Sequence, residues 1–327
     1  MKKLFLIDES LAGRISYFHL ALFLAALPFD SFYTRLILIS LCIHTAIHAR
    51  KQQWRKLADK RVFILAALYI LSLAASLYSV NPQEALFDLT KELGIIIFPI
   101  VFVLQPIDLP KYRNNLLTFF LISCVATVVF LFADAFRVIL YYKMPASFIF
   151  SESFLNQHFS EPLQLHATYL SMYVAVALFF ALDRFKKLHR SVERFLMLAA
   201  VLLLVASLFQ LASRAVIIGV VVTVIAVFPF LVLQRRRRFL FLALTGFLFA
   251  GIGLCIGYND SLHARYINEF RKDLQPADQT ESRASRWLAI VDLIRQKPLI
   301  GYGTGSETNV LKKNIWKKNF TWPGRWA

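Results

Sequence analysis

Charged side chains are scarce in this 327-residue sequence, and acidic ones are the scarcest, with 20 Asp and Glu against 37 Lys and Arg. Only 17% of the residues are charged and 58% are hydrophobic, and the mean hydropathy is +0.57. A soluble domain of this length carries far more charge on its surface. The composition therefore excludes a soluble globular protein and predicts an all-α, polytopic membrane protein.

Cysteine is also rare, because the sequence holds only Cys42, Cys124 and Cys255, each inside an apolar run. No two of them have the spacing of a metal site, and a disulfide framework is excluded as well. The sequence lacks a Ser-His-Asp arrangement, an HExxH motif, an EF-hand loop and a nucleotide-binding loop. We therefore expect neither a metal ion nor a cofactor.

The net charge of +17 would suit a nucleic-acid partner, but its distribution argues against one. The basic residues gather in short loops between apolar runs, which is typical of signals that orient membrane proteins. The N-terminus, Met1-Lys2-Lys3, is not followed by a small-residue cleavage site. We interpret it as a cytoplasmic lead-in rather than a cleaved signal peptide.

Nine apolar runs are candidate membrane spans, each needing roughly 17–25 residues to cross a bilayer as a helix. The fourth is short and is expected to begin earlier, near Ala85, despite the charges of Asp88, Lys91 and Glu92. The nine runs are Ile15–Phe29, Phe32–Ala49, Val62–Val80, Leu93–Gln105, Leu116–Leu140, Leu163–Leu182, Phe195–Ala212, Ala215–Leu233 and Phe239–Gly257.

The charges of the connecting loops predict the orientation of these spans. With the N-terminus in the cytoplasm, the short outer connections contain only Lys91, Lys143 and Arg214 as basic residues. This asymmetry follows the positive-inside rule. Residues 1–257 are then a transmembrane bundle, and residues 258–327 form a periplasmic region. The inner connections contain Arg50, Lys51, Arg55, Lys56, Lys60, Arg61, Lys111, Arg113, Arg184, Lys186, Lys187, Arg190, Arg194 and the run from Arg235 to Arg238.

One arginine stands between two long apolar runs, Phe195–Ala212 and Ala215–Leu233, at Ser213-Arg214. No acidic residue lies in either run to neutralise it. An ionised side chain at membrane depth is costly and normally faces protein, water or an anionic ligand. Arg214 is therefore the first candidate for contact with a substrate. The alternative is that it ends one span and reaches the lipid headgroups.

The periplasmic region contains an amphipathic helix, predicted over residues 283–296, that lies on or near the outer surface of the membrane. Pro298 marks its end, and Ser282 is its expected N-cap. Arg283 and Arg286 are three residues apart and project from neighbouring positions. Two guanidinium groups suit a phosphate or diphosphate. Binding of membrane lipid headgroups is the alternative.

Two further patterns lie near the expected outer face. Gly301, Gly303 and Gly305 alternate after the helix, which indicates a tight turn, since no strand–helix context supports a phosphate-binding loop. His166 stands at the outer end of the sixth run, where it is a candidate proton acceptor or a hydrogen-bonded anchor. Asp134 and Arg137, three residues apart in the fifth run, are expected to form an ion pair.

Three stretches, taken in order and spacing, resemble the O-antigen ligase and polymerase superfamily of bacterial inner-membrane proteins. They are Leu211-Ala212-Ser213-Arg214, then Ser282-Arg283-Ala284-Ser285-Arg286-Trp287, and then Lys297-Pro298-Leu299-Ile300-Gly301-Tyr302-Gly303-Thr304-Gly305. The segment from Leu165 to Ser171 is similar to the family's His-x-x-Tyr stretch. The signal is concentrated in residues 165–305.

The resemblance implies a metal-independent transfer of a glycan from undecaprenyl diphosphate to lipid A–core on the periplasmic side. It implies that Arg214 binds the diphosphate and that Arg283 or Arg286 adds positive charge. Family members carry a further His-Asn stretch, and residues 306–327 contain no histidine, so the sequence reads as shortened and the family's base as missing. A polymerase of the same superfamily and a transporter of lipid-linked glycans are the alternatives.

Overall fold

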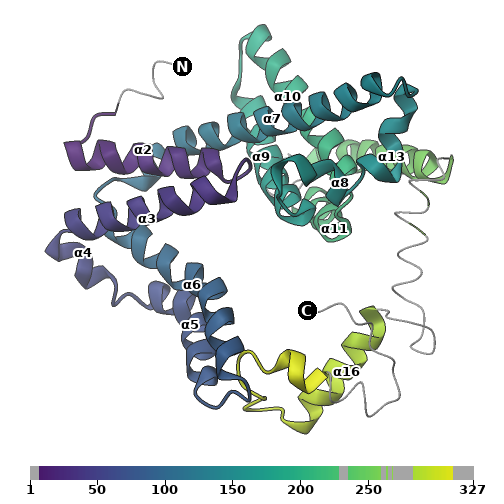
Figure 1. Cartoon of the computed structure of the whole chain (residues 1–327). Coiled ribbons are helices and arrows are strands. Elements are labelled where there is room, and N and C mark those ends of the chain that lie inside the picture. Colours follow the sequence, from purple (N-terminus) through teal and green to yellow (C-terminus); the bar gives the residue numbers. More distant parts are fainter. Residues whose placement is uncertain (1–6, 228–234, 259–262, 264–266, 268–282, 312–327) are drawn as a thin grey trace. The chain divides into compact units, whose positions relative to one another are not determined.

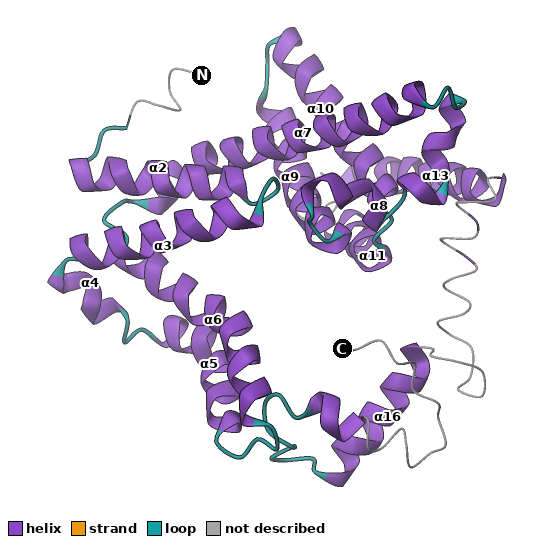
Figure 2. Ribbon diagram, in the orientation of Figure 1, coloured by secondary structure: helices purple, strands orange, loops and turns teal. Residues whose placement is uncertain are grey.

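The computed structural model describes residues 7–227, 235–258, 263, 267 and 283–311, and these residues form helices and loops, with no strand among them (Figures 1 and 2). An all-helical fold is thus confirmed for the described residues. The helices that correspond to the nine apolar runs are α2 (Leu11–Ala26), α3 (Ser31–His48), α5 (Lys60–Ser76), α6 (Pro82–Leu104), α7 (Leu109–Tyr141), α9 (Ala167–Lys187), α10 (Ser191–Leu211), α11 (Arg214–Val222) and α13 (Arg235–Tyr258).

Three of these helices, α7, α9 and α10, are long and apolar enough to cross a membrane by length and composition. Helix α2 and the helix that begins at Arg214 are apolar but shorter. Helix α6 has 23 residues, but Glu84, Asp88, Lys91 and Glu92 lie in its first half. The chain is therefore a membrane protein with several apolar helices, and the count of nine spans stays a prediction.

Capping residues explain where several helices begin. Helix α6 begins at Pro82, confirming the expected early start, because the side chain of Asn81 accepts a hydrogen bond from the amide of Glu84 at 3.3 Å. Helix α9 begins at Ala167 rather than at Leu163. A 3₁₀ turn, η3 (Glu161–Leu163), precedes it, and Gln164 adopts a left-handed conformation with φ of 52°.

The eighth apolar run does not form one regular α-helix. Helix α11 ends at Val222 and continues as a π-helical turn, η4 (Thr223–Val227). The hydroxyl of Thr223 donates to the carbonyl of Gly219 at 2.7 Å, a side-chain contact of the kind that accompanies bends in membrane helices. The rest of the run, up to Leu233, lies outside the described residues.

Two compact units make up the chain, and each is built from separate segments. The first unit holds residues 1–41 and 107–270, and the second holds residues 42–106 and 271–327. This division follows contacts between helices. The predicted division into a transmembrane part (1–257) and a periplasmic part (258–327) concerns sides of the membrane and stays a prediction.

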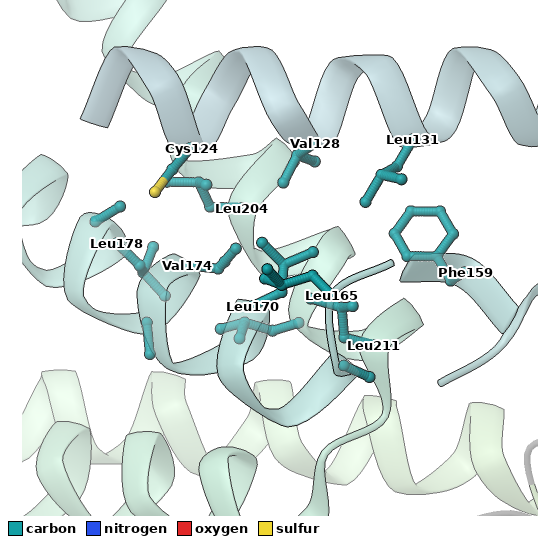
Figure 3. Packing of buried hydrophobic residues seen from close by; sticks show 14 of the residues in the cluster. Cys124, Val128, Leu131, Phe159, Leu165, Leu170, Val174, Leu178, Leu204 and Leu211 are labelled. Atoms are coloured by element: carbon teal, nitrogen blue, oxygen red, sulfur yellow. The ribbon is translucent and has the colours of Figure 1, made fainter. Parts of the chain in front are cut away.

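The core of the first unit lies where α7, α9 and α10 meet (Figure 3). Ala167, Ala177 and Ala181 of α9 are fully buried, and such small side chains let helix backbones approach closely. Phe159, from the short helix α8 (Gln157–Ser160), closes one end of this core. Larger members of the cluster are Cys124, Val128, Leu131, Leu170, Val174, Leu178, Leu204 and Leu211.

Helices α2 and α7 run in the same direction. The fully buried ring of Tyr17 packs edge-on against Tyr112, with ring centroids 5.5 Å apart, and the hydroxyl of Ser123 donates to the carbonyl of Ala25. Residue numbers therefore rise together along both helices. Parallel neighbours start on the same side of a membrane, which agrees with the predicted orientation of the first and fifth spans.

The second unit is organised around the antiparallel hairpin of α5 and α6. Gln105, just after α6, is buried, and its side-chain amide donates to the hydroxyl of Thr45 at 2.8 Å. The backbone carbonyl of Gln105 accepts a hydrogen bond from the side chain of Gln53, in the short helix α4 (Lys51–Lys56), at 2.6 Å. The unit also contains α16 (Arg283–Gln296) and the glycine turn that follows it.

Candidate functional site

The Ser-Arg pair lies at a two-residue turn between α10 and α11. Ala212 ends α10 in a left-handed conformation (φ 48°, ψ 32°), and its amide donates to the carbonyls of Leu208 and Phe209, both at 3.2 Å. Ser213 is extended, and Arg214 is the first residue of α11. This break at Ala212 and Ser213 confirms that the two apolar runs are separate helices.

Arg214 thus occupies the N-terminus of a helix, and its side chain is half-buried. The backbone amides there carry a partial positive charge, so a cation at this position is disfavoured by about 0.3–1 kcal/mol. A helix N-terminus also favours anions, because its first amides point outward unpaired. An arginine and a helix N-terminus together form an electropositive site that suits an anionic ligand.

Residues 146–156, named the outer segment after their predicted side of the membrane, are tied to the end of α10 by one buried side chain. The side-chain nitrogen of Gln210, Nε2, donates to the backbone carbonyls of Ile149 and Phe154, at 2.7 and 2.5 Å. The carbonyl of Gln210 in turn accepts from the amide of Asn156 at 3.0 Å. Gln210 is 2% exposed, so these bonds are shielded from water. Sequence reasoning missed Gln210, because its partners are more than fifty residues away.

Two residues next to the hydrogen bonds of Gln210 have strained backbone conformations. Ala212 and Asn156 both have positive φ, 48° and 56°, although neither is glycine. Such conformations cost about 1–3 kcal/mol each and persist only where surrounding contacts impose them. Both residues flank the hydrogen bonds of Gln210, which shows that this part of the first unit is held in a defined geometry next to Arg214.

His166 is the N-cap of α9. Its Nδ1 accepts a hydrogen bond from the amide of Thr168 at 3.3 Å, and its exposed ring stands edge-on to Tyr169. In the neutral ring the proton is then on Nε2, which leaves no lone pair there to accept another proton. The contacts favour the anchor interpretation of His166, and its catalytic role stays a prediction.

A cavity of about 350 Å³ lies beside the outer segment and is lined by titratable groups, of which the sequence had singled out only Asp134. Asp134, His158 and Glu161 line it together with Phe154, whose carbonyl is bonded to Gln210. The Nδ1 of His158 lies 3.6 Å from the carboxylate of Glu161. His158 and Glu161 are three residues apart, and Asp134 joins them from α7, 24 residues earlier in the sequence.

The expected ion pair of the fifth run is confirmed. A guanidinium nitrogen of Arg137 lies 2.6 Å from the carboxylate of Asp134. The side chain of Arg137 is 79% exposed and that of Asp134 only 22%. The pair therefore lies at the surface of the first unit, with the carboxylate turned toward the cavity and the arginine away from it.

Helix α16 spans Arg283–Gln296, which confirms the predicted helix. Arg283 and Arg286 lie in its first turn, where no acidic residue accompanies them. Trp287 and Ile294, on the predicted apolar face, are 67% and 56% exposed. The predicted N-cap, Ser282, lies outside the described residues. Arg283 and Arg286 belong to the second unit, whereas Arg214 and His166 belong to the first.

All three glycines after α16 have positive φ: 70° at Gly301, 88° at Gly303 and 75° at Gly305. The prediction of a tight turn is confirmed. The turn packs against the α5–α6 connection of the same unit. The hydroxyl of Ser79 donates to the carbonyl of Thr304 at 2.6 Å.

Comparison with known protein families gives one match, in which residues 199–326 match the O-antigen ligase family. The matched range contains Arg214, Arg283, Arg286 and the glycine turn, so the sequence resemblance is confirmed there. Among curated proteins and among solved structures, no protein matches this chain.

Proposed function

We propose, from the match of residues 199–326 to the O-antigen ligase family, that the chain is a glycosyltransferase of the bacterial inner membrane. In this proposal it moves a glycan from undecaprenyl diphosphate to lipid A–core on the periplasmic face. The observation that carries the proposal is Arg214, the first residue of α11, between two apolar helices and inside the matched range.

The proposed reaction is a substitution at the anomeric carbon of the donor glycan. A hydroxyl oxygen of the acceptor forms a bond to this carbon, the bond from the carbon to the diphosphate breaks, and undecaprenyl diphosphate leaves. Negative charge grows on the diphosphate as the bond breaks. The guanidinium of Arg214 and the N-terminus of α11 stabilise that charge, which lowers the barrier.

The acceptor hydroxyl loses a proton in the same step, and a side chain within hydrogen-bond reach must take it. His166 is the candidate from the sequence, but its Nδ1 is used by the cap of α9. His158 is a second candidate, since it lines the 350 Å³ cavity and lies next to Glu161, whose carboxylate can orient the ring. We propose that the acceptor sugar occupies this cavity.

Arg283 and Arg286 extend the proposal to the second unit. Both stand in the first turn of α16, which contains no acidic residue, at the positive end of the helix dipole, which favours an anion. We propose that they add positive charge for the same diphosphate, and that the exposed apolar face of α16 rests on membrane lipid.

A transfer assay with the full-length chain in lipid vesicles tests the proposal. The donor is an undecaprenyl-diphosphate-linked glycan and the acceptor is purified lipid A–core. We expect a lipid A–core bearing the glycan to appear together with free undecaprenyl diphosphate. A longer glycan that stays on undecaprenyl diphosphate would identify a polymerase instead. Movement of the donor across the vesicle membrane without any new glycosidic bond would identify a transporter.

A further inference from the structure

The glycine turn, residues 300–306, is bound to the last turns of α5 and to the connection between α5 and α6 by four hydrogen bonds. Tyr78 and Ser79 donate from their hydroxyls to the carbonyls of Ile300 and Thr304, both at 2.6 Å. The hydroxyl of Thr304 donates back to the carbonyl of Ser72 at 2.8 Å. The hydroxyl of Ser306 accepts from the amide of Val80 at 3.1 Å and lies 3.3 Å from the hydroxyl of Ser79.

Two of the three glycines are required by this contact. A Cβ atom at Gly303 would lie 2.7 Å from the Cα of Ser79 and 2.8 Å from the carbonyl of Ala75. A Cβ at Gly305 would overlap the backbone of Ala85. Both obstacles are backbone atoms, which cannot rotate away. Nothing lies within 4 Å of a Cβ at Gly301, although its φ is also positive.

The same turn is fastened to the end of α16. The amide of Gly301 donates to the carbonyl of Lys297 at 3.2 Å, and the hydroxyl of Tyr302 donates to the side chain of Gln296 at 3.0 Å. The ammonium of Lys297 lies over the ring of Tyr302, 4.7 Å from its centre. Ser306 is 1% exposed, so the contact at the far end of the turn is closed to water.

We propose that the α5–α6 connection is the docking site of the glycine turn, and that Tyr78 and Ser79 are positioning residues which hold the C-terminal end of α16. We name the four residues Tyr78, Ser79, Thr304 and Ser306 the clasp. The alternating glycines then serve backbone-to-backbone docking rather than phosphate binding. The clasp also requires residues 77–81 and 300–306 to lie on one side of the membrane.

The consequence for the arginines follows from the length of α16. Arg283 and Gln296 stand at opposite ends of a 14-residue helix, about 20 Å apart at a rise of about 1.5 Å per residue. A rigid helix that is fixed at one end restricts where its other end can reach. The clasp therefore restricts where Arg283 and Arg286 can lie. A substitution in the clasp changes the positions of these two arginines through a movement of α16.

Cross-linking tests the docking without any need for activity. In the full-length chain with Cys42, Cys124 and Cys255 changed to Ser, the pair Ser79→Cys and Ser306→Cys is introduced. Because the two hydroxyl oxygens are 3.3 Å apart, we expect a disulfide on mild oxidation in native membranes, identified by mass spectrometry of the joined peptides. Absence of the joined peptide from correctly inserted protein would overturn the proposal.

The glycines provide a matched pair of variants. In the same cysteine pair, Gly303→Ala should reduce the disulfide yield at least tenfold, whereas Gly301→Ala should leave it within twofold. Both changes place a side chain at positive φ, so their difference isolates the close approach to Ser79. Equal yields for the two variants would contradict the clasp.

The positioning role rests on the proposed function and has its own readout. In the transfer assay, Ser79→Ala should raise KM for the lipid-diphosphate donor several-fold with kcat and the amount of inserted protein unchanged, and Ser79→Thr should restore KM. An unchanged KM together with a formed disulfide would overturn the positioning role alone. An assay in which the unsubstituted chain transfers no glycan would count against the proposed function, and the disulfide would still decide the clasp.

Discussion

The three arginines of the candidate site, Arg214, Arg283 and Arg286, lie at helix N-termini, where helix electrostatics least favours a cation. Arg214 begins α11, and Arg283 and Arg286 lie in the first turn of α16. In isolation each placement is unfavourable by about 0.3–1 kcal/mol. With an anion bound, the interaction free energy at such a position becomes favourable, because the anion interacts with the guanidinium and with the outward-pointing amides at once.

Two substitutions of Arg214 test how specific the site is. Arg214→Ala removes both the positive charge and the paired N–H donors of the guanidinium. We expect the transfer rate to fall by about 10²–10³-fold, as for the loss of one hydrogen-bond donor that stabilises developing charge. Arg214→Lys keeps the charge but loses bidentate geometry, so an intermediate rate is expected. Membrane fractionation controls for insertion. Full activity of inserted Arg214→Ala would remove this residue from the mechanism.

The two histidines can be told apart by choosing a substitute that still caps a helix. Asn is a good N-cap, so His166→Asn preserves the start of α9 while removing a titratable group. We expect this variant to keep its transfer rate within about threefold. His158→Gln should lose about 10²-fold, the lower end of general-base contributions. The opposite pattern of rates would assign the proton transfer to His166.

At the scale of elements, apolar periodicity and charge predicted the helices well. All nine runs correspond to helices, and the predicted helix over residues 283–296 has the observed bounds. The errors occur at helix ends, because α9 begins four residues later than Leu163, after a 3₁₀ turn. Local hydropathy cannot distinguish a 3₁₀ turn from the first turn of a helix.

Contacts between elements could not be predicted, because they join residues far apart in the sequence. Ser79 and Thr304 are 225 residues apart, and Gln210 meets Ile149 across 61 residues. Ser79 and Gln210 are ordinary polar residues near the ends of apolar runs. The glycine spacing indicated a turn with unusual dihedrals, but nothing in the sequence indicated which surface it approaches.

The link between α10 and the outer segment should be strong, because Gln210 is buried and bonds two carbonyls. Gln210→Leu leaves both carbonyls without this donor, and we expect a loss of stability of about 1–3 kcal/mol. Limited proteolysis should then cut residues 146–156 faster. Ser207→Ala is the control, since the hydroxyl of Ser207 bonds only within its own helix, to Leu204. Equal cleavage of the two variants would contradict this role of Gln210.

At the scale of the whole molecule, contacts within each unit agree with the orientation predicted from charge. The parallel arrangement of α2 and α7 suits two spans that both begin in the cytoplasm. The clasp joins two segments that are both predicted to be periplasmic. These contacts are independent of the positive-inside rule, so their agreement supports the nine-span arrangement.

A pair of single cysteines tests that arrangement. In the cysteine-free chain, Ser153→Cys lies in the outer segment and Ser191→Cys begins α10, and both positions are exposed. A membrane-impermeant thiol reagent added to intact cells should label residue 153 and not residue 191. After the inner membrane is opened, both should react. Labelling of residue 191 in intact cells would contradict the predicted orientation.

The measurement that tests the central claim most directly is the glycolipid profile of the source strain after deletion of this gene. The account predicts lipid A–core without its glycan, while the complete glycan accumulates on undecaprenyl diphosphate, and it predicts that the restored gene, but not its Arg214→Ala variant, reverses both changes. A lipid A–core that still carries its full glycan after the deletion would contradict the account.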